Sequence, residues 1–193
     1  MTKALIFDCF GVLYRGSRDY LYERVSDENR QQLADLNRAS DYGYVTEVEY
    51  LEQASAITGF SPADLEELFK QAHRRNDELF ELISHYRQDY KIGLLSNVGR
   101  GVMDNMISPN DREELFDGVV LSSDVGTIKP YPEIYELMAQ KLGVEPEDCI
   151  MIDDMPSNVS GAEETGMRGV VFKTTKDLQI ALANLGVKRP QLA

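Results

Sequence analysis

The sequence has no long apolar run and only two cysteines. No stretch approaches the ~20 apolar residues that a membrane-spanning helix needs, and the run at residues 4–7 is too short for a signal peptide. Cys9 and Cys149 have no metal-ligand spacing, and each lies in or beside a short apolar run. We therefore expect a cytoplasmic protein whose cysteines are reduced thiols in the core.

Basic residues are outnumbered by acidic residues, 20 against 33, which gives a net charge of −13 at pH 7. This balance argues against nucleic acid or an anionic membrane as the main partner. It does not exclude an anionic substrate, because one bound metal ion can reverse the sign of the charge locally. The length of 193 residues, with 42% hydrophobic and 27% charged residues, is typical of one globular domain, with or without an insertion.

Four short apolar runs, each followed by polar residues, stand out in this sequence. Short apolar runs predict buried parallel strands, and in open α/β sheets chemistry gathers where such strands end. Asp8 follows the run at 4–7, and Ser96 and Asn97 follow the run at 92–95. Lys129 comes a short interval after the run at 119–121, and Asp153 and Asp154 follow the run at 150–152. Carboxylates, a hydroxyl and an ammonium group at one sheet edge would suit a divalent cation and a phosphoryl group.

The pattern of apolar residues divides the chain into three parts. Residues 3–8 predict a strand, residues 17–88 predict helices alone, and residues 90–190 alternate strand and helix, with strands at 91–95, 118–121, 149–152 and 169–172. Such alternation predicts an α/β fold, a Rossmann-like parallel sheet with right-handed crossovers. Pro132 and Pro156 are expected to begin two of the crossover helices, and Gly143 and Gly166 are expected to end them.

The helical part forms an insertion between the first two strands. A first helix is expected from Asp19, with a break near Ser26-Asp27. The capping box at Thr46 to Glu49 predicts the start of a second helix, Ser61-Pro62 that of a third and Asn76 that of a fourth. About four helices are enough for a small bundle. We expect residues 1–16 and 89–193 to form the core domain and 17–88 a helical cap, which would exclude water from the site and select substrate.

Each polar feature has an ordinary explanation when it is taken alone. Asp8 would then be a turn residue, Ser96-Asn97 a helix cap and Lys129 a surface lysine. The adjacent acids Asp153-Asp154 are more specific, because neighbouring carboxylates at a buried strand end repel each other and favour a bound cation. The four features together, in this order, favour a functional site. The histidines, His73 and His85, lie on predicted cap helices and are assigned no chemistry.

The four features resemble the motifs of the haloacid dehalogenase-like (HAD) hydrolase superfamily. The matching segments are Phe7–Leu13, Leu94–Asn97, Lys129–Tyr135 and Ile152–Asp154 with Asn158, Gly161-Ala162 and Gly166-Met167. The resemblance covers nearly the whole chain and is closest to the phosphatase-like branch. It implies a Rossmann-like core, and the insertion stands where the family's C1-type helical cap belongs.

The resemblance also implies a role for each residue. Asp8 matches the nucleophile that forms an aspartyl-phosphate. Magnesium would be held by the Asp8 carboxylate, the backbone carbonyl of Phe10 and Asp154, with Asp153 acting indirectly or through water. Phosphate would be bound by Ser96, by amides of the turn at Asn97, and by Lys129. The resemblance thus implies that Asp8, Ser96 and Lys129 are the catalytic residues.

Phe10 departs from the family pattern, because most HAD phosphatases have a second Asp there as general acid and base. Its loss removes proton transfer worth ~10²–10⁴-fold in such chemistry, although the backbone carbonyl can still bind metal. An aromatic residue at this position resembles the metal-independent 2-haloacid dehalogenases, which have Tyr. That branch lacks the paired acids found here at Asp153-Asp154. Some phosphatase-like subgroups, including relatives of sugar-1-phosphate phosphatases, also lack the second Asp.

These features predict a cytoplasmic, magnesium-dependent hydrolase that acts on a small phosphorylated metabolite. A degenerate HAD domain that binds a phosphorylated ligand or a protein without turnover is one alternative. A metal-independent dehalogenase is another, and an α/β domain without a site is the least favoured. The substrate is not predicted, because it depends on cap side chains and on the loop at Tyr14–Gly16. No protein partner is predicted.

Overall fold

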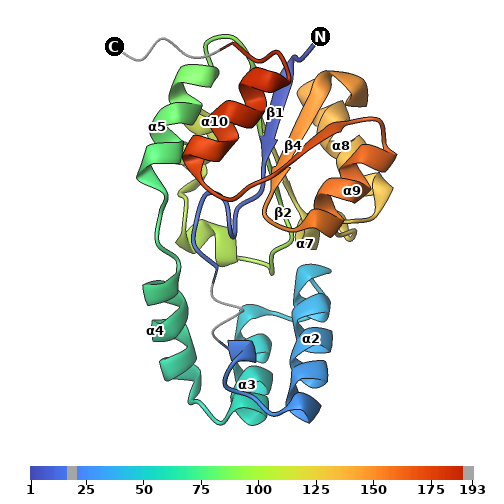
Figure 1. Cartoon of the computed structure of the whole chain (residues 1–193). Coiled ribbons are helices and arrows are strands. Elements are labelled where there is room, and N and C mark those ends of the chain that lie inside the picture. The colour runs from blue at the N-terminus through green and yellow to red at the C-terminus, as the bar shows by residue number, and fades with distance from the viewer. Residues whose placement is uncertain (17–20, 189–193) are drawn as a thin grey trace.

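The computed structural model describes residues 1–16 and 21–188. In that part of the chain, five parallel strands form one sheet in the order β3-β2-β1-β4-β5 (Figure 1). The strands are β1 (Ala4–Phe7), β2 (Lys91–Ser96), β3 (Gly118–Leu121), β4 (Cys149–Asp153) and β5 (Arg168–Val171). Their ends lie within one residue of the expected ranges, and the expected Rossmann-like parallel sheet is confirmed.

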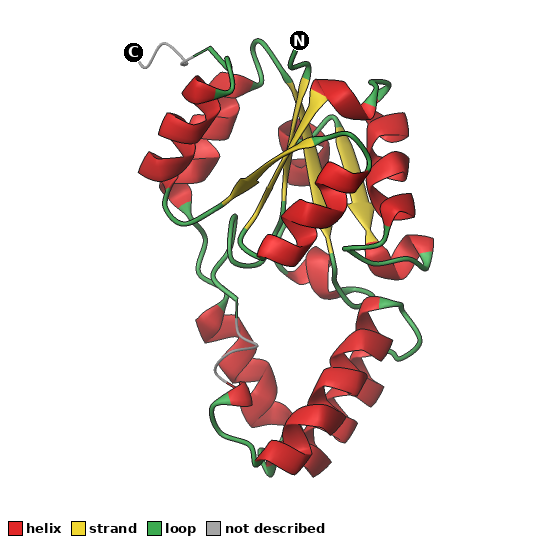
Figure 2. Cartoon of the chain, turned by 45° about the vertical axis from the view of Figure 1, so that its right-hand side comes forward, coloured by secondary structure: helices red, strands yellow, loops and turns green. Residues whose placement is uncertain are grey.

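Helices cover both faces of the sheet (Figures 1 and 2). One face carries α5 (Asp77–Tyr86) and α10 (Thr175–Asn184), and the other carries α8 (Pro132–Leu142) and α9 (Pro156–Glu164). Leu5 and Phe7 of β1 belong to the core cluster of the first face, and Ala4 and Ile6 to that of the second. Because alternate residues of a strand point to opposite faces, a strand covered on both sides is apolar throughout.

Proline and glycine set the ends of two crossover helices. Pro132 lies in the first turn of α8, and Gly143 closes the helix in the left-handed conformation with φ 64°. Pro156 begins α9, which ends at Glu164, two residues before Gly166. The shorter elements are η1 (Val102–Asn105), α6 (Pro109–Leu115), α7 (Ser122–Val125) and η2 (Pro146–Asp148). No helix among the described residues is long and apolar enough to cross a membrane.

Three helices lie apart from the sheet, in the lower half of Figure 1. They are α2 (Asp27–Asp41), α3 (Glu47–Thr58) and α4 (Pro62–Ala72). They surround a cluster of their own, made of Leu21, Val25, Leu33, Leu36, Ala54 and Leu65. Thr46 and Glu49 form the expected capping box, and Ser61 caps the helix that begins at Pro62. The expected helix start at Asp19 lies outside the described residues, and Ser26 caps α2.

The helix expected from Asn76 is α5, and its packing differs from the expectation. Residues 17–88 are predicted to form a cap that includes this helix, yet Leu79, Ile83 and Tyr86 lie in the core cluster shared with β1. The reason is that an amphipathic pattern shows one apolar face but not the surface that covers it. The domain ranges 1–16 with 89–193 and 17–88 stay a prediction, but α5 packs with the sheet.

Two neighbouring segments connect the sheet to the three outer helices. The Arg15 amide donates to the carbonyl of Arg74 at 2.9 Å, and the Asn76 amide donates to the carbonyl of Leu13 at 2.9 Å. A separate contact lies at the end of α2, where Ser122 Oγ donates to the carbonyl of Asp41 at 2.6 Å. These contacts hold the outer helices beside the strand ends that carry the polar residues. We refer to α2, α3 and α4 as the outer helices below.

Candidate active site

The polar residues that follow the strands meet at one edge of the sheet. Strand β1 lies between β2 and β4, and the register pairs Phe7 with Leu94 on one side and with Ile152 on the other. Asp8 and Asp153 therefore leave adjacent strands at the same level. The structure brings these acids together, as expected for the carboxyl ends of parallel strands, while their roles stay predictions.

Lys129 forms a buried ion-paired centre with two of the acids. Its Nζ lies 2.8 Å from Asp8 Oδ1 and 2.6 Å from Asp153 Oδ2, and it donates to the carbonyl of Leu95 at 3.1 Å. These three acceptors match the three N–H donors of an ammonium group. The side chains of Lys129 and Asp153 are 1% and 0% exposed, so the pair is shielded from solvent. A lysine in such surroundings has a specific electrostatic role, because a buried charge without partners is costly.

Asp153 and Asp154 have the same side chain but different surroundings. Asp153 accepts hydrogen bonds from Asn158 Nδ2 at 3.0 and 3.1 Å and from the Met155 amide at 2.9 Å, in addition to its contact with Lys129. Asp154 is exposed and its carboxylate lies against Gly11, where an added Cβ would collide with Asp154 Oδ2. Asp153 is thus suited to orienting Lys129, and Asp154 is the acid that can reach a ligand in solution.

The three acids can offer oxygen atoms to one cation. One carboxylate oxygen each of Asp8, Asp153 and Asp154 lies within 4.8 Å of the others. Magnesium prefers oxygen ligands and retains several waters, so a few carboxylates at this spacing suit it. Since Asp153 already accepts several hydrogen bonds, Asp8 and Asp154 are the better direct ligands. The residues therefore fit the cation that the sequence predicts.

The electrostatics of the centre depend on burial. Burial raises the pKa of Asp8 from 3.8 to about 7, Lys129 opposes the increase, and Asp153 and Asp154 add to it. Burial would by itself lower the pKa of Lys129, but the attraction of Asp8 and Asp153 outweighs it and the pKa is raised. Lys129 therefore stays protonated at neutral pH. A cation beside Asp8 would favour its ionised form, because an opposite charge lowers the pKa of a carboxyl group.

Ser96 and Asn97 follow β2 and have different surroundings. Asn97 Nδ2 donates to the carbonyl of Lys129 at 2.9 Å, and the Lys129 amide donates to Asn97 Oδ1 at 2.8 Å. The side chain of Asn97 therefore positions the Lys129 backbone, and any contact with phosphate would come from its backbone amide. Ser96 is fully buried, and its Oγ has no hydrogen-bond partner among the described residues. A buried hydroxyl without a partner is costly, and its predicted contact with phosphate stays a prediction.

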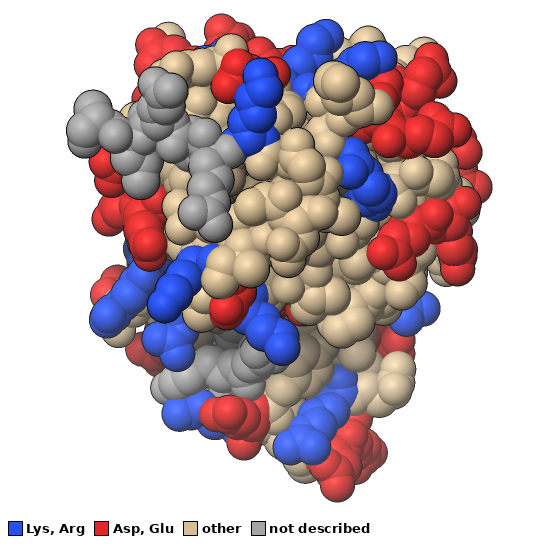
Figure 3. All heavy atoms as spheres, turned by 45° about the horizontal axis from the view of Figure 1, so that its top comes forward, with Lys and Arg blue, Asp and Glu red and all other residues tan. Residues whose placement is uncertain are grey.

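A cleft between the strand ends and the outer helices gives access to this centre. It has a volume of about 2110 Å³ and is lined on the sheet side by Asp8, Lys129 and Asp154, whereas Ser96 and Asp153 lie behind the wall. Basic side chains also line it: Arg15, Lys70, Arg74, Arg75 and Arg100. Figure 3 shows several Lys and Arg side chains around the recess in the lower half of this face, with Asp and Glu side chains among them and along the margins above. Acidic side chains line the cleft too, namely Glu23, Glu47, Asp64, Glu66 and Glu67, so its lining carries charges of both signs.

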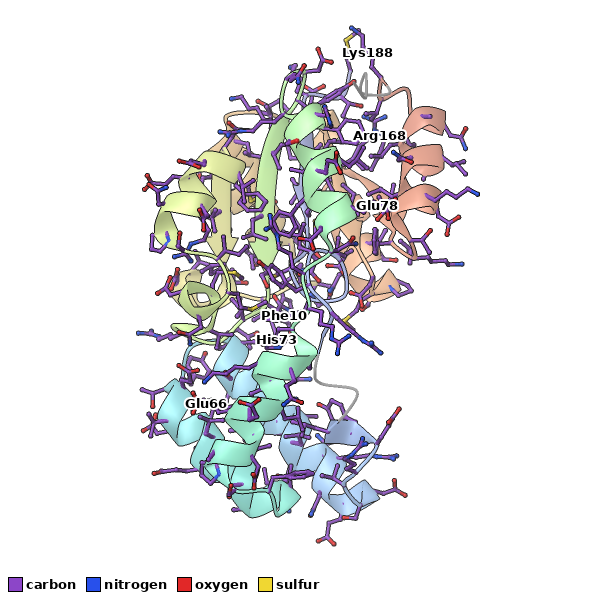
Figure 4. The ribbon with its side chains drawn as sticks, turned by 90° about the vertical axis from the view of Figure 1, so that its left-hand side faces the viewer. Phe10, Glu66, His73, Glu78, Arg168 and Lys188 are labelled. Carbon is purple, nitrogen blue, oxygen red and sulfur yellow. The ribbon has the colours of Figure 1, made fainter. Side chains whose placement is uncertain are left out.

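Phe10 and His73 face each other where the two parts of the molecule meet (Figure 4). Their ring centroids are 5.0 Å apart, both side chains are half-buried, and both line the cleft. Burial lowers the pKa of His73, so its imidazole is neutral near pH 7. No chemistry was predicted for His73 from the sequence. Its contact with Phe10 depends on packing between residues far apart in the chain. The only sequence signal was its place at the end of α4, directly before the connecting segment.

Comparison with known families identifies the class of protein. A family model described as haloacid dehalogenase-like hydrolase matches residues 2–166. Because this match covers most of the chain and all four motifs except Met167, the chain belongs to the haloacid dehalogenase-like hydrolases. The resemblance read from the motifs is therefore confirmed.

Two curated relatives match parts of the chain. One is chloroplast flavin mononucleotide hydrolase 1 of Arabidopsis thaliana, which is 48% identical over 62 residues, or 32% of this chain and 25% of the relative. The other is pyrophosphatase PpaX of Bacillus cereus strain AH820, which is 29% identical over 111 residues, or 53% of this chain and 51% of the relative. The matched part of the chain thus spans about half or less of the length of these relatives.

Two solved structures share the fold over nearly the whole chain. A HAD-like family hydrolase from Porphyromonas gingivalis has a TM-score of 0.77 and 27% sequence identity, covering 97% of this chain and 99% of that one. The HAD family enzyme BT-2542 from Bacteroides thetaiotaomicron, in complex with magnesium and inorganic phosphate, has a TM-score of 0.74 and 22% identity, covering 94% and 99%. The fold around the cleft is therefore that of this hydrolase family.

Proposed function

We propose that the protein is a magnesium-dependent phosphatase that transfers a phosphoryl group from a small phosphorylated metabolite to Asp8. The observation that carries this proposal is the buried Lys129 ammonium between Asp8 and Asp153, with Asp154 beside it on the cleft wall. A domain without a site has no reason to bury three charges at the bottom of a cleft, because their desolvation is costly. An ionised carboxylate beside a cation site is suited to attack on phosphorus.

The residues of the centre would share the binding of metal and phosphate. Asp8, Asp154 and the backbone carbonyl of Phe10 would hold magnesium, which when bound neutralises negative charge on the phosphoryl oxygens. Asp153 would act indirectly, by fixing Lys129. Ser96 Oγ would donate to a phosphoryl oxygen, and backbone amides of the turn at Asn97 would assist it. Lys129 would hold Asp8 in place and stabilise the charge that develops in the transition state.

The reaction would proceed in two displacements. An Asp8 carboxylate oxygen forms a bond to phosphorus, and the bond from phosphorus to the ester oxygen breaks, with the electron pair leaving on that oxygen. Water then attacks the phosphorus of the aspartyl-phosphate, releasing phosphate and restoring the Asp8 carboxylate. Phe10 can neither give a proton to the leaving oxygen nor take one from the water, so rates should depend on the leaving group.

The relatives support this proposal over the other activities of the family. One is named as a hydrolase of flavin mononucleotide and another as a pyrophosphatase, and a neighbour in fold was crystallised with magnesium and phosphate. The paired acids Asp153 and Asp154 argue against a metal-independent dehalogenase. A binding domain without turnover remains the second candidate, and the observation that favours it is Phe10 in place of an acid.

Magnesium binding should depend on Asp154 more than on Asp153. We expect Asp154→Asn to weaken magnesium binding by more than about 100-fold, because a direct ligand is lost. Asp153→Asn should weaken it by about 10–100-fold, as is usual for a residue that orients the ligands. Isothermal titration calorimetry would measure both, with Asp124→Asn at the exposed Asp124 as a control expected to bind like the wild type. Equal magnesium affinity in the wild type and Asp154→Asn would rule out the proposed ligand set.

Turnover should depend steeply on the basicity of the leaving group. Without an acid at position 10, the departing oxygen leaves with little proton assistance, so aryl and anomeric phosphates should react much faster than alkyl phosphates. A series of aryl and alkyl phosphates with graded leaving-group pKa would measure this in kcat/KM. A flat dependence would show that another group supplies the proton.

The same prediction can be tested by restoring the acid. Phe10 is half-buried and lines the cleft, so a carboxylate there has access to solvent. Phe10→Asp should raise kcat for alkyl phosphates by at least about tenfold and change kcat for aryl phosphates little. Phe10→Asn is the matched control, because it removes the ring contact with His73 in the same way but adds no acid. If Phe10→Asn raises alkyl turnover equally, the effect comes from space in the cleft and not from proton transfer.

A further inference from the structure

Four aromatic rings form a continuous series along the cleft. Phe10 lies 5.0 Å from His73, His73 lies 6.2 Å from Phe69, and Phe69 lies 6.2 Å from Tyr50, measured between ring centroids. The rings of His73 and Phe69 are nearly parallel, with an angle of 13° between their planes. All four line the cleft. The series begins two residues from Asp8 and continues into the outer helices, as the position of Phe10 and His73 in Figure 4 shows at its first step.

The rings on the outer helices both pack on the apolar cluster of those helices and face the cleft. Tyr50 and Phe69 pack on the apolar cluster of those helices, yet both remain half-buried because part of each ring lies at the cleft. Ligand pockets are lined mostly by apolar and aromatic side chains, and covering the exposed part of these rings would favour binding. A planar ring system covers such area best, because stacking and edge contacts add to the burial of apolar surface.

The series ends at the buried side-chain amide of Asn37, which determines the direction of the hydrogen bonds made by two tyrosine hydroxyl groups. Tyr50 donates its hydroxyl proton to Asn37 Oδ1 at 2.7 Å, and Asn37 Nδ2 donates to the hydroxyl of Tyr22 at 2.9 Å. Asn37 is 4% exposed, whereas Tyr22 and Tyr50 line the cleft. Because the Tyr22 oxygen accepts from the amide, its own proton is available to another acceptor. The far end of the aromatic series thus presents a hydrogen-bond donor.

We propose that the cleft selects phosphate esters that carry a planar heteroaromatic ring with hydrogen-bond acceptors on its edge. The phosphate would lie at Asp8 and Lys129, the ring would lie along Phe69 and His73, and the ring acceptors would meet Tyr22. This inference names the substrate class of the proposed phosphatase and so rests on that function for turnover, although the binding it describes can be measured separately. Small esters such as glycerol phosphate would occupy only the phosphate end.

Equilibrium binding of three probes tests the proposal. The probes are flavin mononucleotide, which has a ring and edge acceptors, phenyl phosphate, which has only a ring, and glycerol phosphate, which has neither. They are titrated, with magnesium, against the Asp8→Asn variant of the 193-residue chain, so that no probe is consumed. Flavin binding is followed by fluorescence quenching and the others by displacement. We expect flavin mononucleotide to bind at least about tenfold more tightly than glycerol phosphate, with phenyl phosphate between them.

Two further substitutions locate the binding on the aromatic series. Phe69→Leu keeps an apolar side chain in the cluster but removes the ring. It should weaken the binding of flavin mononucleotide by about tenfold and leave the affinity for glycerol phosphate within about twofold of its original value. Tyr22→Phe, which removes a single oxygen atom, should weaken the binding of flavin mononucleotide about three- to tenfold and leave the affinity for phenyl phosphate unchanged. Tyr44→Leu is the control, because Tyr44 is 75% exposed and does not line the cleft, and it should change nothing.

The outcomes separate this inference from the proposed function. Equal affinity for flavin mononucleotide and glycerol phosphate would overturn the inference, and so would wild-type flavin affinity in both Phe69→Leu and Tyr22→Phe. If Phe69→Leu does not fold, Tyr22→Phe alone decides, since its shape is unchanged. Ring-dependent binding without turnover of any ester by the wild type would support the ligand class and reject the phosphatase.

Discussion

Replacing Asp8 with Asn should reduce turnover of every phosphate ester by about 10⁴-fold or more, as expected when the nucleophile is lost. An amide is neutral and cannot form a stable acyl-phosphate bond, yet it has nearly the shape of the carboxylate. Its oxygen can still accept from the Cys9 amide, which donates to Asp8 Oδ1 at 2.7 Å, and from Lys129. The measurement is kcat/KM on the best aryl phosphate, at saturating magnesium.

The loss should come from chemistry and not from unfolding. Asp8 is a buried carboxylate that Asp153 and Asp154 repel, so removing its charge relieves repulsion while Lys129 keeps Asp153 as a partner. We expect the melting temperature of metal-free Asp8→Asn to equal or exceed that of the wild type. Asp124→Asn at an exposed acid should keep wild-type kcat/KM. Activity of Asp8→Asn within tenfold of the wild type would exclude Asp8 as the nucleophile.

Replacing Lys129 with Met should both destabilise the protein and abolish turnover. The substitution leaves Asp8 and Asp153 buried without their shared cation, and breaking a buried pair in this way typically costs about 3–5 kcal/mol. Denaturant unfolding in the presence of a chelator measures the loss of unfolding free energy. Lys141→Met, at an exposed lysine of α8, is the matched control and should change stability by less than about 0.5 kcal/mol.

The deficit of Lys129→Met should become smaller as the pH falls toward 7. Burial raises the pKa of Asp8 to about 7 even with Lys129 nearby, and losing the ammonium would raise it further. An unfolded Asp titrates near pH 3.9, so between this value and neutral pH the folded variant binds a proton that the unfolded chain does not. Acidification therefore stabilises the folded variant, and below about pH 7 it stabilises the folded wild type in the same way. The deficit should therefore shrink as the pH falls from about 9 to about 7, and a deficit as large near pH 7 as near pH 9 would contradict this account of the centre.

The sheet was predictable because its strands are buried on both faces. Segments such as residues 4–7 and 149–152 are apolar throughout, as a sheet covered on both faces requires. The helix ends at Pro132, Gly143 and Thr46 were also predictable, because caps and breakers act locally. The position of α5 on the sheet was not predictable, because its sequence shows an apolar face without identifying the partner.

The proximity of Asp8, Lys129 and Asp153 was predictable from the general rule that polar residues gather where parallel strands end. The hydrogen-bond partners of these residues were not predictable. The motif resemblance gave Asp154 to the metal and Asp153 an indirect role, but only the fold shows that Asp153 is completely buried and Asp154 exposed. The hydrogen bonds of Asn97 to the Lys129 backbone depend on a loop conformation. The contact of His73 with Phe10 joins residues far apart in the chain, and such contacts are set by packing.

The most direct test of the central claim is the ¹⁹F spectrum of beryllofluoride added with magnesium. Beryllofluoride binds an aspartate oxygen as phosphoryl groups do, so it tests the nucleophile and its metal without requiring turnover. The account predicts bound fluorine resonances in the wild type that disappear when magnesium is removed and are absent in Asp8→Asn. Absence of any bound signal in the wild type at saturating magnesium would contradict the claim that Asp8 is a phosphoryl acceptor.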